Sequence, residues 1–400
     1  MKGIFPLKGV IKHYDWGGFS LIPEMLLQEN QAHKPYAEYW MGTHPLGMGQ
    51  VKTSGSNWSP AEDICGPLPY LLKVLDVRDM LSIQVHPGRE EAEAAFAREN
   101  EAGIPLDAPN RNYKDPNHKP EMMVALSEFW LLHGFKPEKE LTDTLEKIPE
   151  LNRFLPVFLQ GGYKALYQQV MEMPSTEVHE ILAPLLERIQ PDYAAGRLDK
   201  SDPSYWAAKA ALHFNKTGVT DRGIFSVYFF NLVHLQPGQG IFQGAGVPHA
   251  YLEGANVELM ANSDNVLRGG LTSKHIDVQE LLRHVSCAAT RPAVISPLPD
   301  EKGEYQYPVP VPDFRISLFR LNDGARIAFK ADGPEILLCT KGKMYLTDGV
   351  SRILLEPGFP AALVTEGVQL SAEAGNGGDE KQPRGVESLL FRASGGIHKR

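Results

Sequence analysis

The sequence has few cysteines, and the few are far apart. Cys65, Cys287 and Cys339 form no CxxC pair. This number and spacing exclude a disulfide framework and a zinc–thiolate site, and they are typical of a protein from a reducing compartment. Any metal centre in this chain must therefore use other ligands.

Long hydrophobic runs are also missing. The most apolar stretch, residues 224–235, is short and is interrupted by Asn231 and His234, whereas a membrane-spanning helix needs about 20 apolar residues. The N-terminal segment MKGIFPLKGVIKHYDWGG lacks the apolar core of a secretory signal peptide. We therefore expect a cytoplasmic protein without a membrane partner.

Basic residues are in deficit. The chain has 40 Lys and Arg against 49 Asp and Glu, a formal net charge of −9. Nucleic-acid binders usually carry a basic excess, so we expect no nucleic-acid partner. An anionic small substrate is not excluded, because a pocket can be locally positive. The length of 400 residues and the 42% hydrophobic content predict a folded chain of two or three domains.

The spacing of apolar residues divides the chain into three regions. Residues 1–135 alternate short apolar runs with turns, which predicts strands, with a short helix over 89–100. Residues 136–221 repeat apolar side chains every three or four positions, which predicts a helical block. From Gly223 to about Phe391, strand patterns return between Gly and Pro turns. We therefore predict a mainly β protein, a sandwich or barrel with a helical insertion.

Four polar residues in strand-like segments are candidate metal ligands. Gln84 and His86 alternate with apolar residues in LSIQVHPG, residues 81–88, so in a strand their side chains point to the same face. Glu121 lies in NHKPEM and His249 in GVPHAYLEG. Two imidazoles and a carboxylate form a common site for Zn²⁺, Fe²⁺ or Mn²⁺, to which Gln84 adds a neutral oxygen. The residue types alone leave the metal open.

Five motifs carry a resemblance to a known family. They are YDWGG, AEYWMGTHP, LSIQVHP, YKDPNHKPEM and, above all, GAGVPHAYLEGANVELMANSDNVLRGGLTSKHID over residues 244–277. Together they closely resemble the type I mannose-6-phosphate isomerases, or phosphomannose isomerases. The resemblance covers motifs from Tyr14 to Asp277 and is weak over the last hundred residues.

This resemblance implies a cupin-type (jelly-roll) β-sandwich or barrel with one Zn²⁺ ion per chain. The implied reaction interconverts D-mannose 6-phosphate and D-fructose 6-phosphate through a metal-stabilised cis-enediol(ate). We therefore expect a monomeric, zinc-dependent aldose–ketose isomerase that acts on a sugar phosphate. In the matching motifs, Arg268 is the catalytic residue, and the metal ligands are Gln84, His86, Glu121 and His249.

The expected domains follow the three regions. We expect a catalytic cupin domain over 1–135 and 222–310, a helical domain over 136–221, and a C-terminal cupin-like domain over 311–400. No histidine lies between His284 and His398. The last domain therefore cannot rebuild a two-histidine site, and we expect it to be metal-free.

The implied reaction needs positive charge near the reacting oxygens and a base for a carbon-bound proton. Two glycines follow Arg268 and permit a tight turn that lets its side chain enter a pocket. Because arginine has a pKa above about 12, we expect Arg268 to stabilise charge and not to remove a proton. Glu258, Lys119 and Asp264 remain alternatives for the base. Candidate substrate contacts are Ser82, Lys119, Lys274, Trp16, Tyr251 and Glu258.

The chain departs from the family pattern after SIQVHP, where Gly88-Arg89 stands in place of Asp/Asn-Lys. Arg89 is the candidate substitute for that lysine, although Arg and Lys differ in geometry. Two other functions remain open. Two histidines and a carboxylate also describe Fe²⁺ oxygenase sites, so a cupin dioxygenase is one alternative. The other is a sugar-phosphate-binding regulator, a cupin without catalysis.

Overall fold

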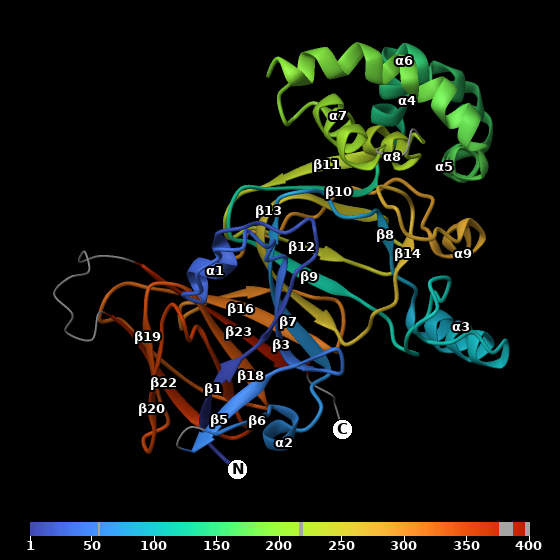
Figure 1. The fold of residues 1–400 in the computed structure, drawn as a ribbon. Coiled ribbons are helices and arrows are strands. Elements are labelled where there is room, and N and C mark those ends of the chain that lie inside the picture. Colours follow the sequence, from blue (N-terminus) through green and yellow to red (C-terminus); the bar gives the residue numbers. More distant parts are fainter. Residues whose placement is uncertain (55–56, 216–218, 376–386, 397–400) are drawn as a thin grey trace.

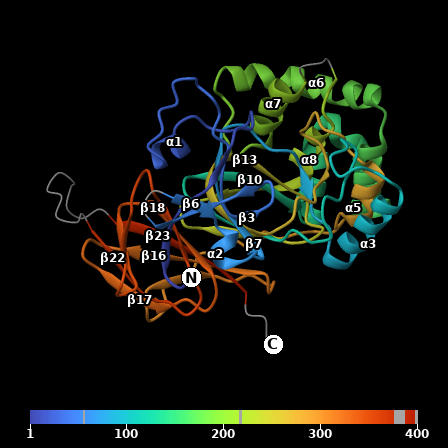
Figure 2. The same ribbon diagram turned by 60° about the horizontal axis from the view of Figure 1, so that its bottom comes forward.

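The computed structural model describes residues 1–400 except 55–56, 216–218, 376–386 and 397–400. A helical layer lies at the top of Figure 1, the first β unit with its eleven-stranded sheet in the middle, and the second β unit with an eight- and a four-stranded sheet at the bottom. Figure 2 shows the helices and the C-terminal strands on opposite sides from another direction. The predicted mainly β fold with a helical insertion is confirmed.

The eleven-stranded sheet forms the first β unit. Its main path runs β11-β10-β13-β7-β3-β2, and five further strands attach to this path. The strands are β2 (Val10–Lys12), β3 (Glu38–His44), β4 (Gly47–Met48), β7 (Tyr70–Val77), β8 (Gln84–Val85), β9 (Glu121–Ala125), β10 (Phe129–Phe135), β11 (Phe230–Leu235), β12 (Gly240–Gln243), β13 (His249–Ala261) and β14 (Leu267–Arg268).

The two faces of β9 show where the core of this unit lies. Met123 joins an apolar cluster in the interior of the first β unit, whereas Met122 and Val124 join a cluster between the two β units. Glu121 begins the same strand and has the parity of Met123, so it faces the interior. A polar group therefore lies at one end of an apolar interior. That interior cluster also contains Leu75, Val77, Phe129, Leu131, Val233, Leu235, Ile241 and Tyr251.

The second β unit includes strands from both ends of the chain. The eight-stranded sheet runs β15-β16-β23-β18-β21-β1-β5-β6, and the four-stranded sheet runs β17-β22-β19-β20. The N-terminal strand β1 pairs with β21, so residues near the start of the chain complete a sheet of C-terminal strands. The strands are β1 (Ile4–Lys8), β5 (Gln50–Ser54), β6 (Asn57–Pro60), β15 (Glu304–Tyr307), β16 (Phe314–Leu321), β17 (Arg326–Lys330), β18 (Glu335–Lys341), β19 (Met344–Thr347), β20 (Arg352–Leu355), β21 (Ala361–Val364), β22 (Gln369–Ala374) and β23 (Ser388–Gly395).

An apolar interface joins the two β units. One face of β16, with Ile316 and Leu318, packs in the same cluster as Leu72 of β7 and Leu259 of β13. These side chains are almost fully buried. Burial of each such side chain contributes about 1.5–3 kcal/mol, so the interface holds the units together without help from charges.

Helices cover the far side of the first β unit. Within the described residues, no helix is both long and apolar enough to span a membrane. The helices of this layer are α4 (Glu138–Lys147), the 3₁₀ helix η1 (Pro149–Phe154), α5 (Leu155–Glu172), α6 (Ser175–Ala194), α7 (Pro203–Phe214) and α8 (Gly223–Phe229). Elsewhere lie α1 (Leu21–Met25), α2 (Glu62–Cys65), α3 (Arg89–Glu101) and α9 (Val278–His284). The helix expected over residues 89–100 is thus present as α3.

One predicted element is wrong. Residues 223–229 were expected to begin a strand, but they form α8 and the strand β11 starts only at Phe230. All seven residues of α8 are buried, and Phe225 and Phe229 pack with Phe154 of the helical layer. A segment buried on every side has no polar face, so its apolar pattern does not distinguish a helix from a strand.

Candidate metal centre and active site

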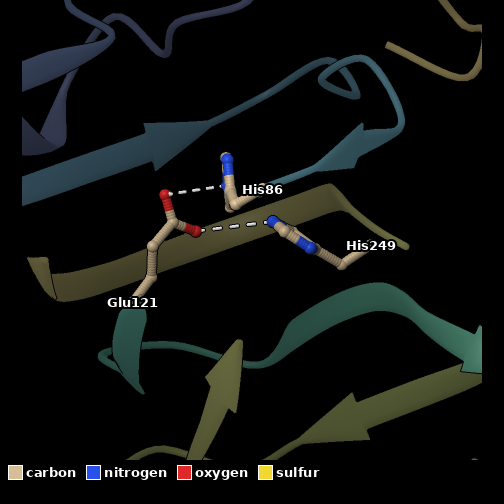
Figure 3. Close-up of side chains that lie close together, drawn as sticks. All are labelled: His86, Glu121 and His249. Atoms are coloured by element: carbon tan, nitrogen blue, oxygen red, sulfur yellow. Dashed lines mark ion pairs between the residues drawn. The ribbon is translucent and has the colours of Figure 1, made fainter. Parts of the chain in front are cut away.

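Three buried side chains converge at one end of the interior of the first β unit (Figure 3). Nε2 of His86 lies 3.4 Å from Oε1 of Glu121, and Nε2 of His249 lies 3.4 Å from Oε2 of the same carboxylate. One ligand atom from each residue lies within 4.8 Å of the other two. His86 follows β8, Glu121 begins β9 and His249 begins β13, so the sheet fixes all three backbones.

Backbone carbonyls orient both imidazoles. Nδ1 of His86 lies 2.8 Å from the carbonyl oxygen of Asn265, and Nδ1 of His249 lies 2.9 Å from that of Val247. A carbonyl oxygen can only accept, so each Nδ1 carries the proton and each Nε2 turns a lone pair towards Glu121. Two lone pairs and a carboxylate at this spacing fit a cation between them. Nε2 of His86 is buried and has no hydrogen-bond partner, which agrees with this fit.

Burial and neighbouring charges keep these groups in the state that a metal needs. Burial lowers the pKa of His86 to about 4, and the charge of Lys119 adds to this effect, so the imidazole is neutral at pH 7. Burial opposes ionisation of Glu121, but Lys119 and the two histidines outweigh it and hold the pKa well below its usual value. Nζ of Lys119 lies 2.6 Å from Oε1 of Glu121. The set thus offers a neutral imidazole at His86 and an anionic carboxylate at Glu121.

The strand register places Gln84 and Arg268 beside His249. Gln84 of β8 is opposite His249 of β13 on one side and opposite Arg268 of β14 on the other. Directly opposite residues in antiparallel strands point to the same face. Gln84 therefore has the placement of a fourth ligand, and Arg268 lies one strand further along the same face.

Arg268 is a cation without an ion-pair partner among the described residues. Its side chain is partly buried, and burial lowers its pKa. No carboxylate among the described residues forms an ion pair with it. Partial desolvation and the nearby charge of Arg268 also lower the pKa of Lys274. A desolvated arginine without a protein partner is suited to an anionic ligand.

The segment that contains Gln84 is shorter as a strand than its alternation predicts, because β8 comprises only Gln84–Val85. Its neighbours are nevertheless fixed by backbone hydrogen bonds. The amide of Leu81 donates to the carbonyl of Tyr251, and that of Ile83 donates to Gly270. Ile83 and Val85 are fully buried, as the alternation predicts.

Shortening Val85 tests this alternation. Val85 packs in the apolar cluster beneath the helical layer, on the side of the segment opposite Gln84. We expect Val85→Ala to lower the free energy of unfolding by about 1–3 kcal/mol through lost burial and packing. Urea denaturation measures the loss, and metal content should stay at the wild-type level. An unchanged free energy of unfolding would contradict the packing role.

A second polar row crosses the interior beside the metal set. Glu258 of β13 is opposite Lys73 of β7, which is opposite Trp40 of β3. Nζ of Lys73 lies 3.1 Å from Oε2 of Glu258, and the hydroxyl of Tyr251 donates to Oε1 at 2.8 Å. Burial and the charge of Glu121 raise the pKa of Glu258. The sequence indicated Glu258 and Tyr251 but not Lys73, which lies in a mostly apolar strand and is recognised only through the register.

The remaining candidates have varied surroundings. Trp16 packs against the interior apolar cluster and stacks on Tyr14, with ring centroids 5.8 Å apart. Oδ2 of Asp264 lies 3.3 Å from Nε2 of His44, a partner that the sequence did not indicate. Ser82 is partly buried, two residues before Gln84. None of these contacts identifies a substrate, so the roles of Trp16 and Ser82 as substrate contacts and of Asp264 as a base remain predictions.

A mainly β fold closed around a buried His–Glu–His set defines a metal-dependent protein of the cupin type. The chain belongs to the type I phosphomannose isomerase family. The model for the phosphomannose isomerase type I catalytic domain matches residues 4–138. The mannose-6-phosphate isomerase of Escherichia coli K12 is 35% identical over 372 residues, covering 88% of this chain and 92% of that protein. The human mannose-6-phosphate isomerase is 34% identical over 385 residues, with coverage of 85% and 88%.

Solved structures agree with this assignment. A crystal structure of mannose 6-phosphate isomerase bound with zinc and yttrium superposes with a TM-score of 0.84 at 30% identity, over 99% of this chain and 100% of that chain. The apo form from Salmonella typhimurium gives a TM-score of 0.83 at 30% identity, with the same coverage. The family and fold inferred from the motifs are therefore confirmed.

Proposed function

We propose that this protein is a zinc-dependent aldose–ketose isomerase that interconverts D-mannose 6-phosphate and D-fructose 6-phosphate. The observation that carries the proposal is the buried set of His86, Glu121 and His249, in a chain that shares its fold and 30% of its residues with a zinc-bound mannose 6-phosphate isomerase. A sugar phosphate is the substrate class that this family implies.

His86, Glu121, His249 and Gln84 would hold one Zn²⁺ ion per chain. The ion, when bound, supplies a Lewis acid that stabilises negative charge on the substrate's oxygens. Arg268 supplies a second positive charge on the same face, because its guanidinium has no protein partner among the described residues. It stabilises the enediol(ate) as charge develops during proton transfer between C1 and C2.

Glu258 is the proposed base. Burial and Glu121 raise the pKa of Glu258, which makes this carboxylate a better proton acceptor than an exposed one. The contact with His44 and the charges of Lys119 and Lys73 lower the pKa of Asp264 despite its burial, so Asp264 is the weaker base. Lys119 already donates to Glu121. Tyr251 and Lys73 hold the two oxygens of Glu258 in place.

Lys274, Lys119, Ser82 and Trp16 are proposed as substrate contacts. Lys274 and Arg268 place two positive charges near one another, as a phosphate requires. Ser82 is partly buried and lies two residues before Gln84. Trp16 offers an aromatic surface beside the interior.

The proposed organisation keeps a catalytic cupin domain over 1–135 and 222–310, a helical domain over 136–221 and a metal-free cupin-like domain over 311–400. Strands β1, β5, β6 and β15 of the catalytic ranges pair into the eight-stranded sheet of the second β unit. Support comes from the placement of all proposed ligands in the first β unit. We further propose a cytoplasmic monomer without a nucleic-acid partner, on the basis of the acidic net charge of −9 and the scattered cysteines.

A coupled assay tests the function directly. Fructose 6-phosphate formed from mannose 6-phosphate is converted to glucose 6-phosphate and detected as NADPH. We expect turnover by zinc-loaded protein, loss of turnover after treatment with a chelator, and recovery when Zn²⁺ is returned. Folded, zinc-loaded protein without turnover would contradict the proposal. Sugar-phosphate binding without turnover would then indicate a regulator, and oxygen uptake by iron-loaded protein would indicate a dioxygenase.

A further inference from the structure

One carboxylate of the second β unit reaches two segments of the first. Asp313 lies directly before β16, and its Oδ1 is 2.6 Å from Nη2 of Arg89. Nε2 of His118 is 3.1 Å from both oxygens of Asp313. Nη2 of Arg89 also lies 2.7 Å from Nε2 of His118. We call these three side chains the Asp313 clasp.

The two segments that meet at this clasp each carry a metal ligand. Arg89 lies three residues after His86, and His118 lies three residues before Glu121. Each intervening stretch contains a proline, Pro87 or Pro120, which fixes one backbone dihedral. Because only two residues separate each clasp residue from its metal ligand, a shift of Arg89 or His118 also displaces the backbone of His86 or Glu121.

We propose that Asp313 is a positioning residue for the metal centre: it ties together the segments that carry His86 and Glu121 and so gives the second β unit a part in zinc affinity. This inference rests on the proposed function, because it takes the His–Glu–His set to be a zinc site. It differs from the expectation that Arg89 takes over a basic role of the lysine in the family pattern, since the guanidinium of Arg89 contacts Asp313 and His118.

Docking of the two β units does not explain the clasp. The units already share an apolar interface that includes Phe314, Ile316 and Leu318. Arg89 is 48% exposed, so its ion pair is screened by water and adds little to stability. Asp313 is only 7% exposed, and its pKa is lowered even though burial opposes this, because His118 and Arg89 both favour the ionised form. A nearly buried carboxylate shared by two segments is suited to fixing their separation.

Competition with a chromophoric chelator, followed by absorbance at fixed pH, measures the zinc dissociation constant of the full-length protein. We expect Asp313→Asn to raise this constant about 10-fold. This is the lower end of the range for residues that orient a metal ligand without binding the metal themselves. Asp313→Glu keeps the charge and should restore part of the loss. Arg89→Met removes the partly exposed partner and should act in the same direction without disturbing the core.

Tyr70→Phe is the matched control. The hydroxyl of Tyr70 donates to the carbonyls of Pro334 and Ala393 at 3.1 Å, so it also joins the two β units but contacts neither ligand segment. We expect this variant to lower the melting temperature of the metal-free protein and to leave the zinc dissociation constant unchanged.

The outcomes distinguish a role of Asp313 in positioning the metal ligands from a role in docking the two β units, and both from the proposed isomerase function. An unchanged zinc dissociation constant in both Asp313→Asn and Arg89→Met would overturn the proposal, as would an equal change in Tyr70→Phe. Wild-type protein that binds zinc but does not isomerise mannose 6-phosphate would overturn the proposed function instead, and the ratio of the constants would still decide the role of Asp313.

Discussion

Replacing Arg268 with alanine is expected to reduce kcat by at least about 10²–10³-fold, the loss seen when one group that stabilises a developing oxyanion is removed, while the protein keeps its zinc. Arg268 lies across the sheet from Gln84, which in turn lies opposite His249. It shares the face of the metal set without belonging to it. Its charge is therefore available to the substrate and is not needed to hold the ion.

Two measurements check this prediction. Steady-state kinetics give kcat and KM for the isomerase reaction, and elemental analysis gives the zinc content of the same sample. Arg268→Lys is the matched control, because it keeps the charge but not the planar donors, and it should retain more activity than the alanine variant. Loss of zinc from Arg268→Ala would mean that Arg268 supports the structure of the site.

The motifs indicated the metal set as a group because its members lie next to turns and prolines whose local pattern is distinctive, and their role as ligands stays a prediction. The segment SIQVHP indicates Gln84 and His86 as candidate ligands, and KPE indicates Glu121. The structure brings His86, Glu121 and His249 within ligand distance. Local sequence was sufficient for these residues.

Residues defined by register were not predictable in the same way. Lys73 enters the site only because β7 pairs with β13 so that Lys73 is opposite Glu258. Asp313 of the second β unit reaches Arg89, which lies more than two hundred positions earlier in the chain. A shift of one residue in strand register would turn either side chain to the other face, and nothing local in the sequence specifies that register.

Prediction of the fold from local sequence has the same limit. The strand and helix regions followed apolar spacing, but α8 did not, because it is buried on all sides. The pairing of β1 with β21 joins the ends of the chain. Strand patterns indicate that both segments are strands, but they do not indicate which strands are partners.

Removing one imidazole from the centre is the second large effect. We expect His86→Ala to weaken zinc binding by more than the roughly 10–100-fold that loss of an outer-shell partner costs, because it removes a direct ligand. The imidazole is fully buried and is fixed by the carbonyl of Asn265. No other described side chain is therefore positioned to replace it as a metal ligand. Gln84→Ala should weaken binding less, since a neutral amide oxygen is a weaker ligand than an imidazole nitrogen.

His284→Ala is the matched control for this comparison. Nε2 of His284 lies 3.3 Å from Oε1 of Glu280, a pair much like His86 and Glu121 at 3.4 Å. The partners around Glu280 are arginines and a tyrosine, with no second imidazole. We expect chelator competition to show that His86→Ala loses zinc and that His284→Ala keeps its zinc affinity. This result would mean that the metal site requires two imidazoles that converge on one carboxylate. A single histidine–carboxylate contact would not be sufficient. Equal zinc affinity in both variants would place the ion elsewhere and would remove the basis for assigning Arg268 and Glu258 to the reaction.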